Sequence, residues 1–289
     1  MKTKILSLSY NAMFKAVFSN NKVILSKLIE AILEHSYINI DIKDKDFIIK
    51  NNELPIDNYN DKQLICDYII KLDNINDLNI ELNRKQYPGV VERNMTYSFK
   101  IYYEHFNRGN EYSEFKKYNL IQVNFNKFKN PNNKSINKYY LLDANDSKNF
   151  LSKSICIINI DIEECYNLVY NNTCKEEISE LEKLAAILYC DYLEDISSIL
   201  ESVRLDNMEK EKFINDINNA SCNKNNQEAI KLEDNIEYRF ELTKEEALRE
   251  KTIDVIKNML KKNYDIKEIS DITGKSTKEI KEIEKSMKD

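Results

Sequence analysis

Apolar residues recur at helical spacing in two stretches near the N-terminus, residues 8–18 and 21–35. In the second stretch the apolar positions fall three and four residues apart, so they share one face of an α-helix. Asn20 or Asn21 is suited to cap that helix, because a short polar side chain accepts hydrogen bonds from the first free backbone N–H groups. A short strand is predicted at residues 46–50.

The pattern changes at residues 64–83, where two apolar segments of strand length flank a polar turn. LICDYIIKL forms the first segment and LNIELN the second, which predicts a β-hairpin. A helix is predicted at 90–108, with Gly109 as its C-cap, because glycine tolerates the left-handed conformation found there. Three later apolar segments predict strands: 117–127, 138–143 and 154–162.

From about residue 174 onward the pattern is helical, and LEKLAAILYCDYLEDISSIL at 181–200 is a long amphipathic stretch. The change from a mixed to a helical pattern places a boundary near residue 170. We therefore expect an α/β core at residues 1–170, with a mixed sheet flanked by helices, and a helical C-terminal region at 171–289.

Capping boxes mark two more helix starts, since a Ser or Thr followed three residues later by Glu satisfies free backbone donors reciprocally. Thr243 and Glu246 predict a helix at 244–262. Ser276 and Glu279 predict a last helix that runs to about residue 286.

The tail at 264–286 joins two short helical segments through the turn ITGKS. This arrangement resembles half of a helix-turn-helix. A packing or dimerising helical hairpin is an equal interpretation, so the sequence leaves a homo-oligomer undecided.

The amino-acid composition argues against several classes of fold and binding site. Only three Gly and three Pro occur among 289 residues, which argues against a loop-rich all-β fold and against a glycine-lined phosphate loop. The net charge of −6 counts against a uniformly basic nucleic-acid binder, although a local basic face can still bind DNA.

Cysteine and histidine usage argues against a zinc site. The six cysteines form no CxxC pair, and the chain has two histidines. Scattered cysteines are typical of reduced thiols in a reducing compartment. No N-terminal signal peptide and no run of about 18 apolar residues is recognisable, so we expect a soluble, cytoplasmic protein without a membrane partner.

The candidate chemistry lies in the hairpin. Asp67 is central in its strand and shares a face with Ile65 and Ile69, so its carboxylate needs a cation or strong donors if it is buried. Glu81 and Asn83 share one face of the second strand. An ordinary hairpin with a solvated polar face is the alternative interpretation.

The length of the turn decides the register. A three-residue turn places Asp67 opposite Glu81, whereas a five-residue turn places it opposite Asn83 and diagonal to Glu81. Both registers hold the three side chains within roughly 5–8 Å of one another. Two carboxylates so close repel, and a divalent cation with oxygen ligands suits such a pair.

Asp67, followed after thirteen residues by Glu81-Leu82-Asn83, resembles the D…ExK core of PD-(D/E)XK nucleases. More specifically, the chain resembles the family of recombination-promoting nucleases and transposases. The segments that carry the likeness are FKAVF at 14–18, CDYII at 66–70, NIELN at 79–83, ERNMTYSFKIYYEHFNRGNEY at 92–112, NLIQVNFNKF at 119–128 and YDIKEISDITGKSTKEI at 264–280.

The resemblance implies a restriction-endonuclease-like fold and metal-dependent cleavage of DNA. Asp67 and Glu81 would bind Mg²⁺, Mn²⁺ or Ca²⁺, and Asn83 would orient the attacking water. Asn83 departs from the Gln of the family and the Lys of the wider superfamily, and Asn11 replaces a frequent Asp. The implied setting is DNA recombination, mobile elements or defence against foreign DNA.

Five further residues are candidates for the site. Lys15 and Arg93 are candidates for phosphate contacts. Lys85 could replace the missing lysine if the strand continues, and Glu30 or Glu34 could complete the metal shell. Solvated surface positions are the alternative for all five residues.

Two other functions compete with a metal-dependent endonuclease. One is a catalytically weakened or inactive family member that acts as a DNA-binding or regulatory protein, which Asn83 and the acidic net charge favour. The other is an interaction protein whose hairpin is purely structural and binds no divalent metal.

Overall fold

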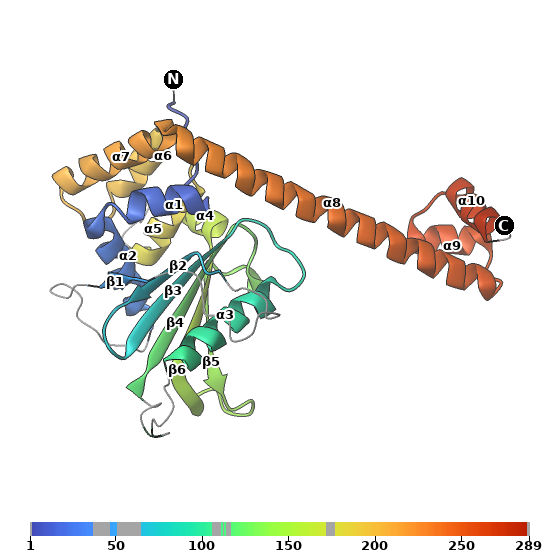
Figure 1. Ribbon diagram of the computed structural model, residues 1–289, viewed down its shortest axis with the longest axis horizontal. Helices are drawn as coiled ribbons and strands as arrows, with labels where there is room; N and C mark the ends of the chain where they lie inside the picture. The colour runs from blue at the N-terminus through green and yellow to red at the C-terminus, as the bar shows by residue number, and fades with distance from the viewer. Residues whose placement is uncertain are drawn as a thin grey trace. The chain divides into compact units, whose positions relative to one another are not determined.

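The computed structural model describes residues 2–36, 47–50, 65–105, 111, 113, 117–171 and 177–287 (Figure 1). Its N-terminal part is a mixed sheet flanked by helices, which confirms the predicted α/β architecture. Gly109, the predicted cap of the long helix, lies outside the described residues.

The six described strands pair in the order β1-β2-β3-β4-β6-β5. Neighbours are antiparallel except for the parallel pairs β3–β4 and β4–β6 at the centre. The strands are β1 (Ile48–Ile49), β2 (Tyr68–Lys71), β3 (Asn76–Asn83), β4 (Asn119–Asn126), β5 (Ile136–Leu142) and β6 (Phe150–Asp161). A short 3-10 helix, η2 (Pro131–Asn133), precedes β5.

The hairpin between β2 and β3 has the three-residue turn. Lys71 pairs with Asp77, and the backbone N–H of Leu72 donates to the carbonyl of Asn76 at 2.9 Å. The carboxylate of Asp73 accepts from the side chain of Asn76 at 2.8 Å, which closes the turn around residues 73–75. In this register Asp67 precedes β2 directly opposite Glu81.

One face of the sheet is apolar. Alternate residues of the central strands, such as Ile80, Val123 and Ile158, are fully buried against helices. These helices include α1 (Asn11–Phe18), α2 (Lys22–Glu34), α4 (Ile162–Asn171), α5 (Glu180–Tyr189), α6 (Leu193–Leu200) and α7 (Asn207–Cys222). Burial of this apolar surface is the main source of stability of the sheet and the helices packed on it.

The opposite face is covered by α3 (Val90–Glu104), which lies along the sheet (Figure 1). Tyr97 and Ile101 of α3 pack on Ile69 and Leu120, but this apolar cluster is small. Beside it the face is lined with buried amides and carboxylates, so α3 covers a polar surface.

The amphipathic stretch at 181–200 is helical, as predicted, but it is divided between two helices. The first ends at Tyr189, and the second begins at Leu193. The N-terminal segment causes the break: the N–H of Ile5 donates to the carbonyl of Asp191 at 3.0 Å, and the N–H of Leu193 donates to that of Thr3 at 3.0 Å. These distant partners hold residues 190–192 extended.

The capping-box prediction at Thr243 is also wrong, because α8 (Lys224–Lys261) passes through this position without a break. The sequence before it is rich in Glu, Lys and Leu, which favour helix continuation. The box at Ser276 is confirmed. It opens α10 (Thr277–Ser286), with the N–H of Ser276 donating to Glu279 Oε2 at 2.9 Å.

The chain divides into two compact units, Met1–Ile230 and Lys231–Asp289. The change from strands to helices follows Asp161, but the later helices α5–α7 share the core of the sheet and therefore belong to the first unit. In the second unit, α9 (Ile266–Thr273) and α10 pack with the end of α8 through Ile256, Ile269 and Ile280.

Among the described residues, no helix is both long enough and apolar enough to cross a membrane.

Phe18 tests the apolar core. Its ring stacks on Phe14 with centroids 4.3 Å apart and meets Phe213 of α7 edge-on at 5.8 Å. Phe18→Ala should lower the free energy of unfolding by about 3–5 kcal/mol, since it leaves a cavity between two helices. Urea titration measures this. Val23→Ala on the exposed side of α2 is the control and should change it by less than about 0.5 kcal/mol. Equal effects would contradict the placement of Phe18 in the core.

Candidate active site

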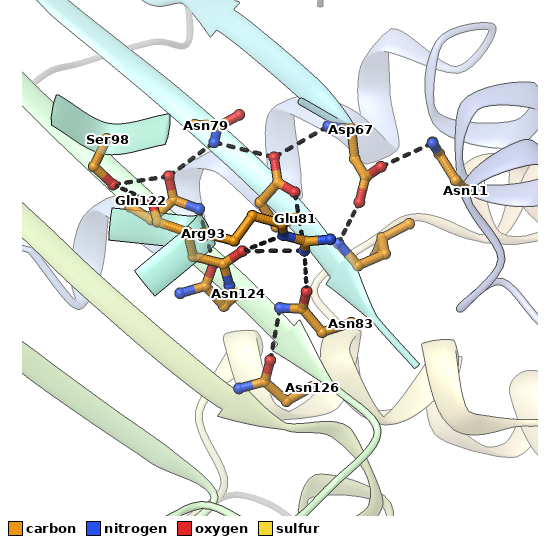
Figure 2. Close-up of polar contacts among 12 residues, drawn as sticks. Asn11, Asp67, Asn79, Glu81, Asn83, Arg93, Ser98, Gln122, Asn124 and Asn126 are labelled. Atoms are coloured by element: carbon orange, nitrogen blue, oxygen red, sulfur yellow. Dashed lines mark hydrogen bonds and ion pairs between the residues drawn. The ribbon is translucent and has the colours of Figure 1, made fainter. Parts of the chain in front are cut away.

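Asp67 and Glu81 meet at the end of the hairpin, where α3 covers the sheet (Figure 2). The backbone N–H of Asp67 donates to Glu81 Oε1 at 3.1 Å, and that of Leu82 donates to Asp67 Oδ2 at 2.7 Å. Asn11 of α1 donates to Asp67 Oδ1 at 2.9 Å. The two acidic side chains are thus locked to each other's strands, and Asn11 holds the carboxylate of Asp67 as an amide donor.

Burial dominates the electrostatics of this pair. Desolvation, and then the neighbouring charge of Asp67, raise the pKa of Glu81 well above its ordinary value, while Arg93 opposes the shift. The pKa of Asp67 is also raised by desolvation, against the opposing effects of the Leu82 N–H, Arg93 and Lys15. At neutral pH the pair therefore favours a bound proton or a cation.

Arg93 brings a positive charge to the strand from α3. Its Nη2 atom donates to Asn83 Oδ1 at 2.5 Å and lies 3.5 Å from Glu81 Oε2. The guanidinium also lies 5.5 Å from the ring centroids of both Tyr87 and Tyr97. The charge that a lysine at position 83 would supply therefore comes from a helix residue.

A network of buried amides extends from the carboxylates across the sheet. Asn79 donates to Glu81 at 3.2 Å and to Gln122 of β4 at 2.8 Å. Asn83 donates to Asn126 of β4 at 2.9 Å. All four amide side chains are almost fully buried, so the polar face of the hairpin is not solvated.

Sequence reasoning named Asn11 only as a departure from the resembled family, and it missed Asn94, Gln122 and Asn126 as parts of this site. A signal for β4 was present, because polar residues alternate with apolar ones through NLIQVNFN. Asn11 gave no such signal, since only the packing of α1 against the hairpin brings it to Asp67.

The remaining candidates lie in different places. Lys15 on α1 is close enough to lower the pKa of Asp67 by its charge. Lys85 follows the end of β3 at Asn83 and is not part of the strand. Glu30 forms an ion pair with Lys27 on α2 at 3.1 Å, and Glu34 is exposed near the end of that helix.

The donor set of Asp67 and Glu81 consists of carboxylate oxygens, which hard divalent cations prefer. Within the described ranges, no cluster of three or more His, Cys, Asp or Glu residues is arranged to hold a metal ion. Two carboxylates nevertheless suit Mg²⁺, which retains several waters and takes its remaining ligands from substrate phosphates.

A family model described as "PD-(D/E)XK nuclease family transposase" matches residues 10–273. Among curated proteins and among solved structures, none matches the chain significantly. The matched range includes the whole sheet, the helices on both of its faces and all the candidate residues.

Glu81→Gln should change the pH dependence of stability in metal-free protein. A carboxyl group whose folded pKa is raised favours the folded state while it is protonated, so stability falls as pH rises above its ordinary value of 4.5. The slope is about 1.4 kcal/mol per pH unit for each proton involved. The variant should therefore lose less stability between pH 5 and pH 8 than the wild type.

Urea titrations at both pH values in EDTA measure this difference. Glu34→Gln, an exposed position on α2, is the matched control and should follow the wild type. An unchanged pH dependence in Glu81→Gln would contradict the buried, desolvated state of this carboxyl.

Proposed function

The chain belongs to the PD-(D/E)XK nuclease family transposases, and from this premise we propose that it is a divalent-metal-dependent DNA endonuclease. The single observation that carries the proposal is the placement of Asp67 opposite Glu81 with Arg93 beside them. The setting that we propose is DNA recombination or the movement of a mobile element, in the cytoplasm.

In this proposal Asp67 and Glu81 hold Mg²⁺ or Mn²⁺. When bound, the ion lowers the pKa of a coordinated water and stabilises negative charge on the phosphate. The hydrogen bonds from Leu82 N–H and Asn11 fix the orientation of Asp67, and Asn79 fixes that of Glu81. Both carboxylates are thus pre-positioned before the substrate arrives.

Arg93 takes the electrostatic role of the missing lysine. Its guanidinium has only donors, so it can bind a non-bridging phosphate oxygen while it keeps Asn83 in place. Lys15 adds a second positive charge on the side of Asp67. DNA is therefore the proposed partner despite the net charge of −6.

A second candidate function is DNA binding without efficient cleavage. Asn83 favours it, because its oxygen accepts from Arg93 and its nitrogen donates to Asn126. An amide engaged on both sides is less available to orient a water than a lysine would be. Metal-dependent nicking separates the two functions.

DNA affinity should be sequence-independent and should fall steeply with salt, since phosphate contacts release counterions. Lys15→Ala should weaken binding to unrelated duplexes equally and reduce the salt slope by about 1. Fluorescence anisotropy at two salt concentrations measures this. Lys148→Ala, in an exposed turn, is the control. A salt-independent affinity would count against phosphate contacts at the site.

Plasmid nicking should require Mg²⁺ or Mn²⁺ and stop in EDTA. Asp67→Ala and Glu81→Ala should each abolish it, because one carboxylate cannot retain the ion alone. Glu34→Ala should leave the rate unchanged. Cleavage that persists in both alanine variants at matched melting temperature would place the active site elsewhere.

Exchanging the charge between helix and strand tests Arg93 directly. Arg93→Gln should reduce nicking by about 10²-fold, the usual cost of one charge-stabilising donor. Asn83→Lys in the Arg93→Gln background should restore part of the rate, because the ammonium then lies where the guanidinium was. Without such recovery, Arg93 would have a purely structural role. Asn83→Lys alone places two cations together and should help less.

A further inference from the structure

A cavity of about 490 Å³ lies between α3 and strands β4, β5 and β6, and Asn124 in its lining pairs with Glu81 across β4 and β3. Its volume falls within the roughly 300–1,000 Å³ of small-molecule sites. The apolar lining includes Val91, Met95 and Phe99 of α3 and Tyr139 and Leu141 of β5, all of them exposed in part. Neither the carboxylates nor Arg93 line it, so the proposed cleavage chemistry does not use this space.

One chain of hydrogen bonds runs from Arg93 to the cavity. The guanidinium can only donate, so it fixes Asn83 with its oxygen towards Arg93, at 2.5 Å. The Asn83 nitrogen therefore donates to Asn126 Oδ1 at 2.9 Å (Figure 2). The amide nitrogen of Asn126, which lines the cavity, has no acceptor among the described residues.

A second chain of hydrogen bonds runs across the strands and also ends at the cavity. Ser98 and Asn79 both donate to Gln122 Oε1, at 3.1 and 2.8 Å. Gln122 then donates to Asn124 at 2.8 Å, and Asn124 donates to Asn159 Oδ1 at 2.7 Å. Asn159 also lines the cavity, and its amide nitrogen has no acceptor in the part of the chain that the structure describes.

Asn94 completes the set. Its oxygen accepts from Arg93 at 3.1 and 3.2 Å, and within the described ranges its amide nitrogen has no acceptor. Three amide donors, from Asn94, Asn126 and Asn159, therefore line one cavity while their oxygens are occupied elsewhere. A ligand that suits this lining has apolar faces and an edge of hydrogen-bond acceptors.

We propose that this cavity binds an unstacked nucleobase of the DNA strand, through the base's carbonyl oxygens, beside the phosphate that is cut. The inference rests on the proposed endonuclease function. The apolar side chains of Phe99 and Tyr139 contact the faces of the base, and exposed Lys129 at the cavity is available to the strand's phosphates. Thymine presents two carbonyl acceptors to these three donors and, unlike cytosine and adenine, carries no exocyclic amine.

The test uses short labelled strands in EDTA, so that binding does not depend on the metal site. One five-nucleotide strand carries a single thymine among abasic positions, a second is abasic throughout, and a third carries difluorotoluene, which has the shape of thymine without its carbonyl acceptors. By anisotropy, the wild type should bind the thymine strand at least 10-fold more tightly than the abasic one. The difluorotoluene strand should be intermediate.

Two variants separate shape from hydrogen bonding. Met95→Trp fills the cavity and should remove the preference for thymine over the abasic strand. Asn159→Asp replaces a donor by an acceptor and should remove only the preference over difluorotoluene. Met208→Trp, on the exposed side of α7, is the matched control and should keep both preferences. Melting curves confirm that each variant is folded.

A wild type without thymine preference, or a preference that survives Met95→Trp, overturns the assignment. Metal-dependent nicking of a fully paired duplex is measured on the same preparations. Nicking without thymine preference removes the nucleobase site and leaves the endonuclease. A thymine preference that Met95→Trp abolishes, without nicking, leaves the nucleobase site and removes the endonuclease. If the protein shows neither nicking nor a preference for thymine, the endonuclease and the nucleobase site are both overturned.

Discussion

Asp67 and Glu81 lie side by side on one face of the sheet. The polar groups around them offset part of the free-energy cost of removing two carboxyl groups from water. Burying charge without compensation is among the most expensive events in folding. Here backbone N–H groups, two asparagines and one guanidinium compensate in part, and the pKa of both acids is still raised. A positive charge beside two such carboxyl groups lowers the free-energy cost of burying them in ionised form, as Arg93 does here.

The sheet divides its two faces between stability and chemistry. Ile80, Val123 and Ile158 point into the large apolar core, whereas their neighbours Asn79, Gln122 and Asn159 point towards α3. Because side chains alternate between the two faces of a strand, a residue that lies on the polar face contributes nothing to the apolar core. The helices packed on the apolar face supply the stability that allows a buried polar network opposite to them.

Arg93 brings a positive charge to that network and also fixes the direction of its hydrogen bonds. An amide can be reversed without a change in shape, and only its partners fix which end donates. A guanidinium at the start of the chain removes the ambiguity at Asn83 and Asn94. Asn83 is thus joined to a positive charge on the helix, and the hydrogen bonds that start at Arg93 continue through Asn126 to the adjoining cavity.

The sequence alone determined the α/β class, most of the strands and the polar face of the hairpin. Alternation in LNIELN and NLIQVNFN fixed which side of each strand is polar, and family motifs pointed to Asp67, Glu81 and Arg93. Only the tertiary structure decided the register, through the turn at Asp73, and the break before Leu193, through pairing with the N-terminal segment. It also decided the contact of Arg93 with Asn83 and that of Asn11 with Asp67. The physical reason is range: periodicity records which side of a segment is buried, whereas a partner tens of residues away leaves no trace in local spacing.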